Sequence, residues 1–369
     1  MTIDTPSNLS AVLYGPGILC MEQTPIDEPK ENEVQINVRA TGICGSDLHY
    51  YHQGRIGTHV LDSAKPMILG HESAGIITKV GSNVDTLAIG DRVVIEPGKA
   101  CLNCNRCNEG RYNLCLTMEF SSSLLRGPNQ GLLREFVCFP AYLCHRMPDS
   151  MTYEQGALVE PLAVAVHSVG RTRTVKKGSC VAIIGAGPIG LLVAATVYAQ
   201  GASKCILFDI NESRLDFSKT YLPRIETVML PKKSCESSIL EWAQDHVQNT
   251  LIGCIEPETI DAVFECTGVE TSVGLSMYLV RRGGVVMLIG LGSSQCLMPI
   301  DLISTREIDV LGNFRYSNVH RQAITMISEN KIPTDGLVSH KFSLDQTLSA
   351  FELLKKGGEN VIKVQIGDF

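Results

Sequence analysis

The stretch CVAIIGAGPIG, residues 180–190, decides the predicted fold. Its first half is a continuous apolar run, the pattern of a strand buried on both faces of a sheet. Its second half has the spacing G-x-G-x-x-G, and an apolar helix is predicted directly after it. Glycines at these positions permit a tight turn, a close approach of pyrophosphate to the backbone and close packing of helix on strand, while the helix N-terminus favours phosphate charge. The stretch therefore predicts a dinucleotide site.

Apolar strands and helical segments alternate beyond this stretch, which is typical of βαβ units on a parallel sheet. Strands are predicted at 180–185, 204–209, 261–265 and 285–290, with helices near 189–200, 211–220 and 270–280. Before about residue 160, short strands such as 33–38 and 75–80 are separated by Gly, Pro and Asp turns, which favours a barrel-like β domain. After residue 311 the alternation ends, and we expect the tail to complete the first domain.

The composition is that of a globular protein with two domains. The chain has 369 residues, of which 44% are hydrophobic and 19% charged, and this length exceeds one ordinary core. No apolar run reaches the length of about 18 residues that a membrane-spanning helix needs, and the first residues lack the features of a secretory signal. The net charge is -7 without a basic run, so neither nucleic acid nor a membrane is an expected partner.

An acidic residue follows the glycine-rich turn at the spacing expected of a nucleotide carboxylate. Asp209 ends the next predicted strand, where its side chain would accept hydrogen bonds from the adenosine ribose and repel a 2′-phosphate. Ile210 follows, with no adjacent Arg for that phosphate, so NAD is favoured over NADP. Arg214, one helical turn on, could contact the adenine or the ribose. The alternative is that Asp209 only caps a helix.

Four cysteines lie within fifteen residues, at Cys101, Cys104, Cys107 and Cys115. Four thiols can close a tetrahedral shell with no open position, as in a structural zinc site. An iron–sulfur cluster or disulfides are weaker alternatives, because disulfides are rare in the reducing cytoplasm, where we expect this protein. Nine other cysteines are expected to be small buried hydrophobes: Cys20, Cys138, Cys144, Cys180, Cys205, Cys235, Cys254, Cys266 and Cys296.

A second metal site is predicted from residues that are scattered along the chain. Cys44 supplies a thiol, His71 and Glu72 supply an imidazole and a carboxylate, and Glu160 supplies another carboxylate. Mixed sulfur, nitrogen and oxygen ligation with room for water is typical of a catalytic zinc site. Each residue alone is unremarkable, since a single His or Cys is more often simply buried.

These motifs together resemble the zinc-containing medium-chain dehydrogenase/reductase family over nearly the whole chain. The stretch GHESAG, residues 70–75, is similar to the zinc signature of that family, and the cysteine motif and residues 185–190 follow in the expected order. The resemblance implies a GroES-like catalytic domain at 1–161 plus 313–369, with a structural zinc lobe at about 98–120. It implies a Rossmann NAD-binding domain at 162–312, two zinc ions per chain and a homotetramer.

Within this family the chain resembles the polyol branch. Glu160 stands in VEPL, residues 159–162, where ethanol-type members have a cysteine. Tyr50, Arg315 and Tyr316 also match the branch, which implies that they contact the hydroxyls of a sugar alcohol, although Arg315 could instead form a surface ion pair. Residues 131–137 are similar to fungal L-arabinitol 4-dehydrogenases, which are favoured, whereas residues 54–57 are more like sorbitol and xylitol dehydrogenases.

The resemblance implies NAD- and zinc-dependent oxidation of a secondary hydroxyl to a ketose, with Ser46 and His49, or Glu160 and a water, moving the proton. Whether Glu72 or Glu160 ligates zinc directly is left open. The cofactor residues implied are Gly185, Gly187, Pro188, Ile189, Gly190, Asp209, Arg214, Ile289, Gly290, Leu291, Asn313, Phe314 and Arg315. The rival hypotheses are a threonine dehydrogenase or general alcohol dehydrogenase, and a non-enzymatic relative that binds NAD and zinc.

Overall fold

The computed structural model describes residues 8–231, 238–250, 258–358 and 360–368. The chain divides into two compact units. The first comprises Met1–Glu160, Ser317–Asn330 and Thr334–Phe369, and the second comprises Pro161–Tyr316 and Lys331–Pro333. Cys235 and Cys254, which were expected to be buried, lie outside the described residues.

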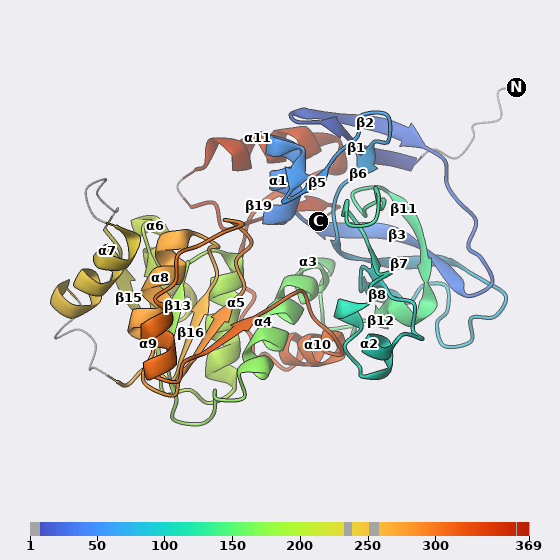
Figure 1. Cartoon of the computed structure of the whole chain (residues 1–369). Helices are drawn as coiled ribbons and strands as arrows, with labels where there is room; N and C mark the ends of the chain where they lie inside the picture. The colour runs from blue at the N-terminus through green and yellow to red at the C-terminus, as the bar shows by residue number, and fades with distance from the viewer. Residues whose placement is uncertain (1–7, 232–237, 251–257, 359, 369) are drawn as a thin grey trace, which may run out of the picture. The chain divides into compact units, whose positions relative to one another are not determined.

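The second unit contains a six-stranded parallel sheet with the strand order β15-β14-β13-β16-β17-β18 (Figure 1). The order reverses between β13 and β16, and in sheets of this kind ligands bind at such a reversal, beyond the carboxyl ends of the strands. The strands are β13 (Cys180–Ile184), β14 (Lys204–Asp209), β15 (Glu226–Met229), β16 (Ala262–Glu265), β17 (Val285–Leu288) and β18 (Asp309–Gly312).

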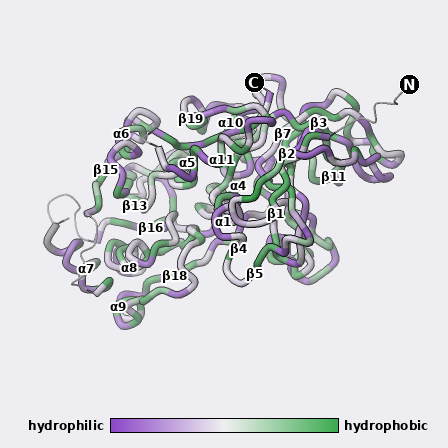
Figure 2. The backbone as a smooth tube through the Cα atoms, turned by 90° about the horizontal axis from the view of Figure 1, so that it is seen from above, coloured by the Kyte–Doolittle hydropathy of each residue, from purple (hydrophilic) through white to green (hydrophobic). Residues whose placement is uncertain are grey.

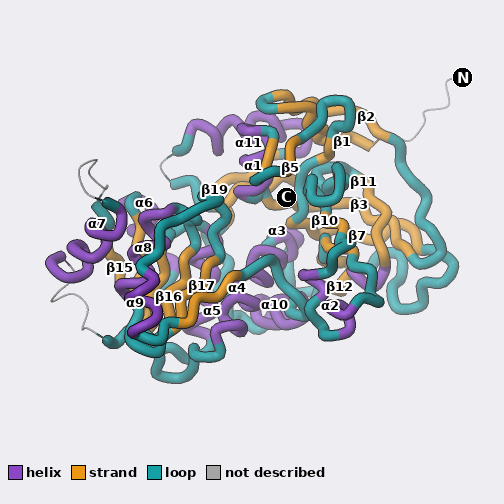
Figure 3. Tube along the Cα trace, in the orientation of Figure 1, coloured by secondary structure: helices purple, strands orange, loops and turns teal. Residues whose placement is uncertain are grey.

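Helices alternate with these strands along the second unit, as Figure 3 shows. They are α5 (Pro188–Ala199), α6 (Glu212–Tyr221), α7 (Ile239–Asp245), α8 (Glu270–Leu279) and α9 (Ile300–Thr305), with a π-helical turn at His246–Thr250 and α4 (Val159–Thr172) at the boundary in sequence. The four predicted strands and three predicted helices are confirmed to within two residues at each end. The sequence patterns did not predict β15, β18, α7 or α9.

Each glycine of the turn after β13 has a separate structural role. Gly185 has φ +107°, in the region that side chains rarely adopt, and a Cβ on Gly190 would lie 1.8 Å from the Gly185 carbonyl oxygen. A Cβ on Gly187 would meet nothing within 4 Å. Pro188 follows as the first residue of α5, where its missing N–H costs nothing. The turn is therefore tight and closely packed, and open only at Gly187.

The core of the second unit lies on its parallel sheet. Phe208 of β14 and Phe264 of β16 are fully buried on strands that flank β13. The core cluster that contains Phe208 also includes Ile184, Val263, Leu275 and Val286. Burial on both faces explains why these strands read as continuous apolar runs in the sequence.

The first unit is built mainly from antiparallel strands. Its largest sheet has the order β12-β8-β7-β3-β20-β19, with β11 also paired to β3, and a smaller sheet has the order β2-β1-β6. The strands are β1 (Asn8–Gly15), β2 (Ile18–Thr24), β3 (Glu33–Gly42), β4 (Arg55–Ile56), β5 (His59–Val60), β6 (Met67–Ile68), β7 (Glu72–Val80), β8 (Arg92–Ile95), β9 (Gly98–Lys99), β10 (Glu119–Phe120), β11 (Phe136–Pro140), β12 (Cys144–Arg146), β19 (Val338–Phe342) and β20 (Lys363–Gly367).

The tail returns to the first unit, because β20 pairs antiparallel with β3 through Gln365 and Gly42. Short helices connect the strands of this unit: α1 (Gly45–Gln53), α2 (Asn105–Asn108), α3 (Tyr153–Ala157), α10 (His320–Ser328) and α11 (Thr347–Lys356). One core includes Tyr51, Leu69 and Phe351, and another includes Ile36, Ile95 and Phe139. The predicted class, a β-rich unit together with a doubly wound parallel sheet, is confirmed.

Hydrophobic and hydrophilic residues alternate over short distances along the described chain (Figure 2). Among the described helices, none combines the length and the apolar character that crossing a membrane requires. All twelve cysteines within the described residues are free thiols. Of the seven described cysteines expected to be buried, Cys144 and Cys205 are buried and the other five are partly exposed.

Candidate active site and metal centres

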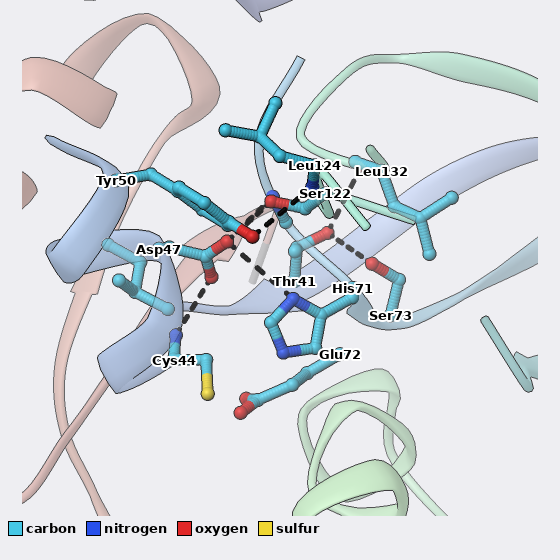
Figure 4. Close-up of polar contacts among 12 residues, drawn as sticks. Thr41, Cys44, Asp47, Tyr50, His71, Glu72, Ser73, Ser122, Leu124 and Leu132 are labelled. Carbon is cyan, nitrogen blue, oxygen red and sulfur yellow. Dashed lines mark hydrogen bonds and ion pairs between the residues drawn. The ribbon is translucent and has the colours of Figure 1, made fainter. Parts of the chain in front are cut away.

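Three predicted ligands converge in the first unit. Cys44 precedes the first turn of α1, Glu72 is the first residue of β7, and His71 directly precedes it. One ligand atom from each lies within 4.8 Å of the others, and Figure 4 shows the three side chains pointing toward one another. His71 and Glu72 are buried, with exposed fractions of 4% and 1%, whereas Cys44 is partly exposed. A cation bound by these three side chains would therefore remain accessible from the side of Cys44.

Asp47 lies behind the imidazole of His71, and the sequence patterns did not predict it as a site residue. Its Oδ1 atom is 3.6 Å from Nδ1 of His71, and it accepts hydrogen bonds from Ser122 Oγ at 2.7 Å and Gly70 N at 3.3 Å. Its Oδ2 atom accepts from Cys44 N at 3.0 Å. A carboxylate on one ring nitrogen directs the other nitrogen toward Cys44 and Glu72. The available signal was its place in the first turn of a helix after Cys44.

Lys363 of β20 is a second unpredicted residue of this site. Its ammonium forms a buried ion pair with Glu72 Oε2 and donates a hydrogen bond to the Ile43 carbonyl at 3.0 Å. Glu72 approaches so closely that a Cβ on Gly42 would lie 2.0 Å from its Oε2 atom. Burial alone would lower the pKa of Lys363, but Glu72 raises it above its usual value. The lysine is therefore charged and offsets part of the negative charge in the site.

The donor set fits a zinc ion. Thiolate, imidazole and carboxylate are the three ligand types that zinc takes, and three protein ligands leave a fourth position for water or substrate. Burial alone would lower the pKa of His71, yet the Asp47 and Cys44 side chains raise it well above its usual value. The surroundings of the imidazole thus favour positive charge.

Four further residues of the first unit were predicted to take part in the reaction or to contact the substrate: Ser46, His49, Tyr50 and Glu160. Glu160 is buried, and it is not among the three residues whose ligand atoms converge. Its charge acts on Lys363, whose pKa it helps to raise. Ser46 and His49 are partly exposed residues of α1. The Tyr50 hydroxyl is buried and accepts a hydrogen bond from Leu124 N at 3.2 Å (Figure 4).

The four-cysteine motif forms a compact cluster of thiols. The Sγ–Sγ distances are 3.5 Å between Cys104 and Cys107, 3.5 Å between Cys115 and Cys101, and 3.9 Å between Cys101 and Cys107. Four sulfurs at about 2.3 Å from one zinc ion would lie about 3.8 Å apart in a tetrahedron. A backbone hydrogen bond from Asn103 lowers the pKa of Cys101 to about 6, toward the thiolate form that binds metal.

The predicted cofactor carboxylate lies at the glycine-rich turn. Asp209 ends β14, and its Oδ2 atom accepts a hydrogen bond from Ala186 N at 2.6 Å. Its Oδ1 atom accepts from Asn211 N at 2.8 Å, and Asn211 in turn caps α6 through Arg214 N. The hydrogen bond to Ala186 therefore joins the end of β14 to the glycine-rich turn after β13, which contains the open position at Gly187.

The remaining predicted cofactor residues follow the carboxyl ends of β17 and β18. Ile289 N and Gly290 N donate to the Glu265 carbonyl, and Asn313 N donates to the Leu288 carbonyl at 2.9 Å. Leu291 is exposed, and the Arg315 guanidinium lies 4.7 Å from the centre of the Phe314 ring. Like Gly185 and Asp209, these residues lie at the carboxyl ends of the parallel strands.

Two predicted substrate residues, Arg315 and Tyr316, belong to the second unit, whereas the metal ligands belong to the first. Arg315 has φ +52°, and Tyr316 is buried. Glu265 was not predicted as a site residue. Its buried carboxylate accepts hydrogen bonds from Thr267 N and Gly268 N and thereby shapes the turn after β16, and burial raises its pKa.

The comparisons with known proteins cover both units. Residues 30–149 match the alcohol dehydrogenase GroES-like domain, and residues 188–329 match the zinc-binding dehydrogenase domain. Sorbitol dehydrogenase from Bos taurus is 41% identical over 97% of this chain and 96% of its own length. The probable D-xylulose reductase A of Arthroderma otae is 39% identical over 97% of both chains.

A solved structure agrees with these matches. L-Idonate 5-dehydrogenase from Escherichia coli superposes with a TM-score of 0.86 at 26% identity, over 98% of both chains. The chain belongs to the zinc-binding dehydrogenase family, with its alcohol dehydrogenase GroES-like domain. The predicted family and the predicted oxidoreductase class are therefore confirmed.

Proposed function

We propose that this protein is an NAD- and zinc-dependent polyol dehydrogenase that oxidises a secondary hydroxyl of a sugar alcohol to a ketose. The convergence of Cys44, His71 and Glu72 carries the proposal of a catalytic zinc site. Glu160, which stands where ethanol-type members have a second cysteine, supports the polyol branch. Relatives named for sorbitol and D-xylulose, at 41% and 39% identity, support the substrate class. L-Arabinitol, xylitol and sorbitol are the candidate substrates, with L-arabinitol favoured.

Cys44, His71 and Glu72 hold the catalytic zinc, and Glu160 acts through a water molecule. The convergence of three ligand atoms within 4.8 Å, with Glu160 outside the group, supports this division. When bound, the zinc ion acts as a Lewis acid that lowers the pKa of the substrate hydroxyl. Asp47 holds His71 in the required orientation, and Lys363 holds Glu72. A second zinc ion, held by Cys101, Cys104, Cys107 and Cys115, stabilises the lobe without taking part in the reaction.

The second unit binds NAD at the carboxyl ends of its parallel strands. The open position at Gly187 admits the pyrophosphate, and Asp209 accepts hydrogen bonds from the ribose. Asp209 disfavours the extra phosphate of NADP by charge repulsion. When bound, NAD would supply the hydride acceptor, and Gly187 and Asp209 would hold it in place for that reaction.

Ser46 and His49 of α1 carry the proton of the hydroxyl to solvent. Their partial exposure and their place on the helix that begins after Cys44 support this role. Tyr50, Arg315 and Tyr316 contact the remaining hydroxyls of the polyol, since guanidinium and phenol groups donate hydrogen bonds to such chains. We further propose a cytoplasmic homotetramer.

The test is NADH formation measured with L-arabinitol, xylitol, sorbitol, threonine and 2-propanol side by side, each with NAD and with NADP. Activity on one or more of the polyols with NAD is expected. Activity confined to threonine and 2-propanol would contradict the polyol assignment. Retention of full activity and full zinc content in Glu160→Ala would contradict the role given to that glutamate.

A further inference from the structure

A third group of potential metal ligands lies in the first unit, apart from both predicted zinc sites. Glu96 directly follows β8, His145 lies in β12 and His320 begins α10. One ligand atom from each lies within 4.8 Å of the others. The side chains of Glu96 and His320 are 5% and 0% exposed, and that of His145 is 13% exposed. The topology thus gathers two buried side chains and one partly exposed side chain, all of metal-ligand type, from segments far apart in sequence.

The spacing of these atoms suits one small divalent ion. Glu96 Oε2 lies 2.8 Å from His145 Nε2 and 3.4 Å from His320 Nδ1. Ligands at about 2.0–2.1 Å from a tetrahedral zinc ion lie about 3.3 Å from one another. The two imidazole rings are stacked, with centroids 5.3 Å apart and planes 17° from parallel. Small rotations of the side chains would bring all three atoms to ligand distance.

The other carboxylate oxygen of Glu96, Oε1, already accepts a hydrogen bond. Tyr112 donates its hydroxyl proton to Glu96 Oε1 at 2.6 Å. This bond orients the carboxylate so that Oε2 faces both histidines, which is how outer partners fix a metal-binding carboxylate. The chemistry of two imidazoles and one carboxylate is a known ligand set for zinc.

A cavity of about 400 Å³ adjoins the group and provides access. All three residues line it, together with Tyr112, Tyr142 and Arg321. Water from the cavity can complete the coordination of an ion.

We propose that Glu96, His145 and His320 form a third metal site, which binds a divalent transition ion of the zinc type. The site joins β8, β12 and α10, and through Tyr112 it reaches the four-cysteine lobe. The Tyr112 hydroxyl also accepts a hydrogen bond from Asn318 N at 2.7 Å, and Asn318 Nδ2 donates to the Gly110 carbonyl at 2.6 Å. Metal binding would therefore hold the segment before α10 against the lobe.

The experiment is metal analysis of the whole protein after equilibration with zinc ion and removal of the excess by dialysis. Wild type is expected to retain about three zinc ions per chain. The variants His320→Gln and Glu96→Gln should each retain about one fewer than wild type. The control His59→Ala replaces an exposed histidine of β5 and should retain the wild-type number. Equal zinc content in wild type and both variants would overturn the proposal.

A spectroscopic measurement on variants whose circular dichroism matches that of the wild type identifies the ligands of the ion that is lost. Cobalt(II) replaces zinc in such sites and reports its ligands, so the wild-type spectrum minus that of His320→Gln should show a site without thiolate ligands. A difference spectrum with thiolate-to-cobalt absorption, or no difference, would contradict the site. Neither readout uses catalysis, so failure of the polyol assay would leave this proposal intact, and the reverse also holds.

Discussion

The Oδ1 atom of Asp47 lies 3.6 Å from Nδ1 of His71, on the side of the imidazole opposite the other two converging ligands. The contact fixes which ring nitrogen faces Cys44 and Glu72. It also adds a negative charge directly behind a neutral ligand, which strengthens the ligand's attraction for a cation. We therefore include the pair in the proposed metal centre, even though Asp47 is not one of the three converging ligands.

Replacing Asp47 with Asn should weaken zinc binding by about 10- to 100-fold, the usual cost of losing an outer-shell partner. The amide keeps the size of the side chain but removes its charge. Zinc affinity is measured by competition with a chelator, and turnover should fall in parallel at limiting zinc. Asp62→Asn, a change at an exposed carboxylate, is the control. Equal zinc affinity in the two variants would exclude the role given to Asp47.

Lys363→Met should lower the free energy of unfolding by about 3–5 kcal/mol, because it leaves Glu72 buried without its cation. Urea unfolding of the zinc-free protein, in the presence of a chelator, measures the change, because bound zinc would replace the missing cation beside Glu72. Lys355→Met removes a half-exposed lysine that lies 3.7 Å from Glu352, and such surface pairs contribute at most about 1 kcal/mol. If both variants lost the same stability, the buried pair would have no special importance.

The glycines of the turn should respond differently to the same added methyl group. Gly187→Ala should fold normally, since its Cβ meets nothing within 4 Å. The methyl group should nevertheless obstruct the pyrophosphate and raise the KM for NAD at least about tenfold, a cost near 1.4 kcal/mol. Gly190→Ala should instead lose about 1–3 kcal/mol of stability through overpacking. Unchanged NAD kinetics in Gly187→Ala would contradict the predicted cofactor position.

Asp209→Ser should raise the KM for NAD by roughly 10- to 100-fold, because hydrogen bonds to a charged group contribute about 1.5–3 kcal/mol. The preference for NAD over NADP should fall at the same time. Steady-state kinetics with both cofactors measure the ratio of kcat/KM for NAD to that for NADP. Thermal unfolding checks that the variant remains stably folded without the hydrogen bond from Ala186 N. Asp216→Ser, at an exposed position of α6, is the matched control. A constant NAD/NADP ratio would argue against ribose recognition by Asp209.

Cys104→Ser should remove about one zinc ion per chain and lower the thermal stability, because three thiols no longer close the tetrahedral shell. The molecules that remain folded should keep their kcat, since this metal has no part in the reaction. Cys20→Ser, at a partly exposed cysteine of β2, should change neither quantity. Loss of kcat without loss of stability would show that the lobe takes part in catalysis.

Local sequence patterns predicted the parts of this protein that depend on local geometry. Residues 180–190 specify a strand, a turn and a helix within one contiguous stretch, and the four cysteines close their cluster within one loop. The short strands β15 and β18, with sequences ETVM and DVLG, lie at the sheet edges and are partly exposed. They lack the continuous apolar run by which β13 and β14 were recognised.

The unpredicted site residues depend on contacts between distant segments. Lys363 donates to a carbonyl 320 positions earlier in the chain, and no spacing rule links such residues before the sheet order is known. Glu96, His145 and His320 come together only because β8 pairs with β12 and the segment carrying α10 returns to the first unit. A single His or Glu in the sequence has no pattern that distinguishes a ligand from an ordinary buried residue.

The pairing of β20 with β3 has a consequence for synthesis on the ribosome. Domains tend to fold in order as the chain emerges, and the parallel sheet of the second unit, which ends at Gly312, is complete before β20 leaves the exit tunnel. Until then the last residues of β3, from Ala40 to Gly42, lack their partner strand on one side, and Glu72 lacks its lysine. Glu72 would then gain its ion pair with Lys363 only after the parallel sheet of the second unit has formed.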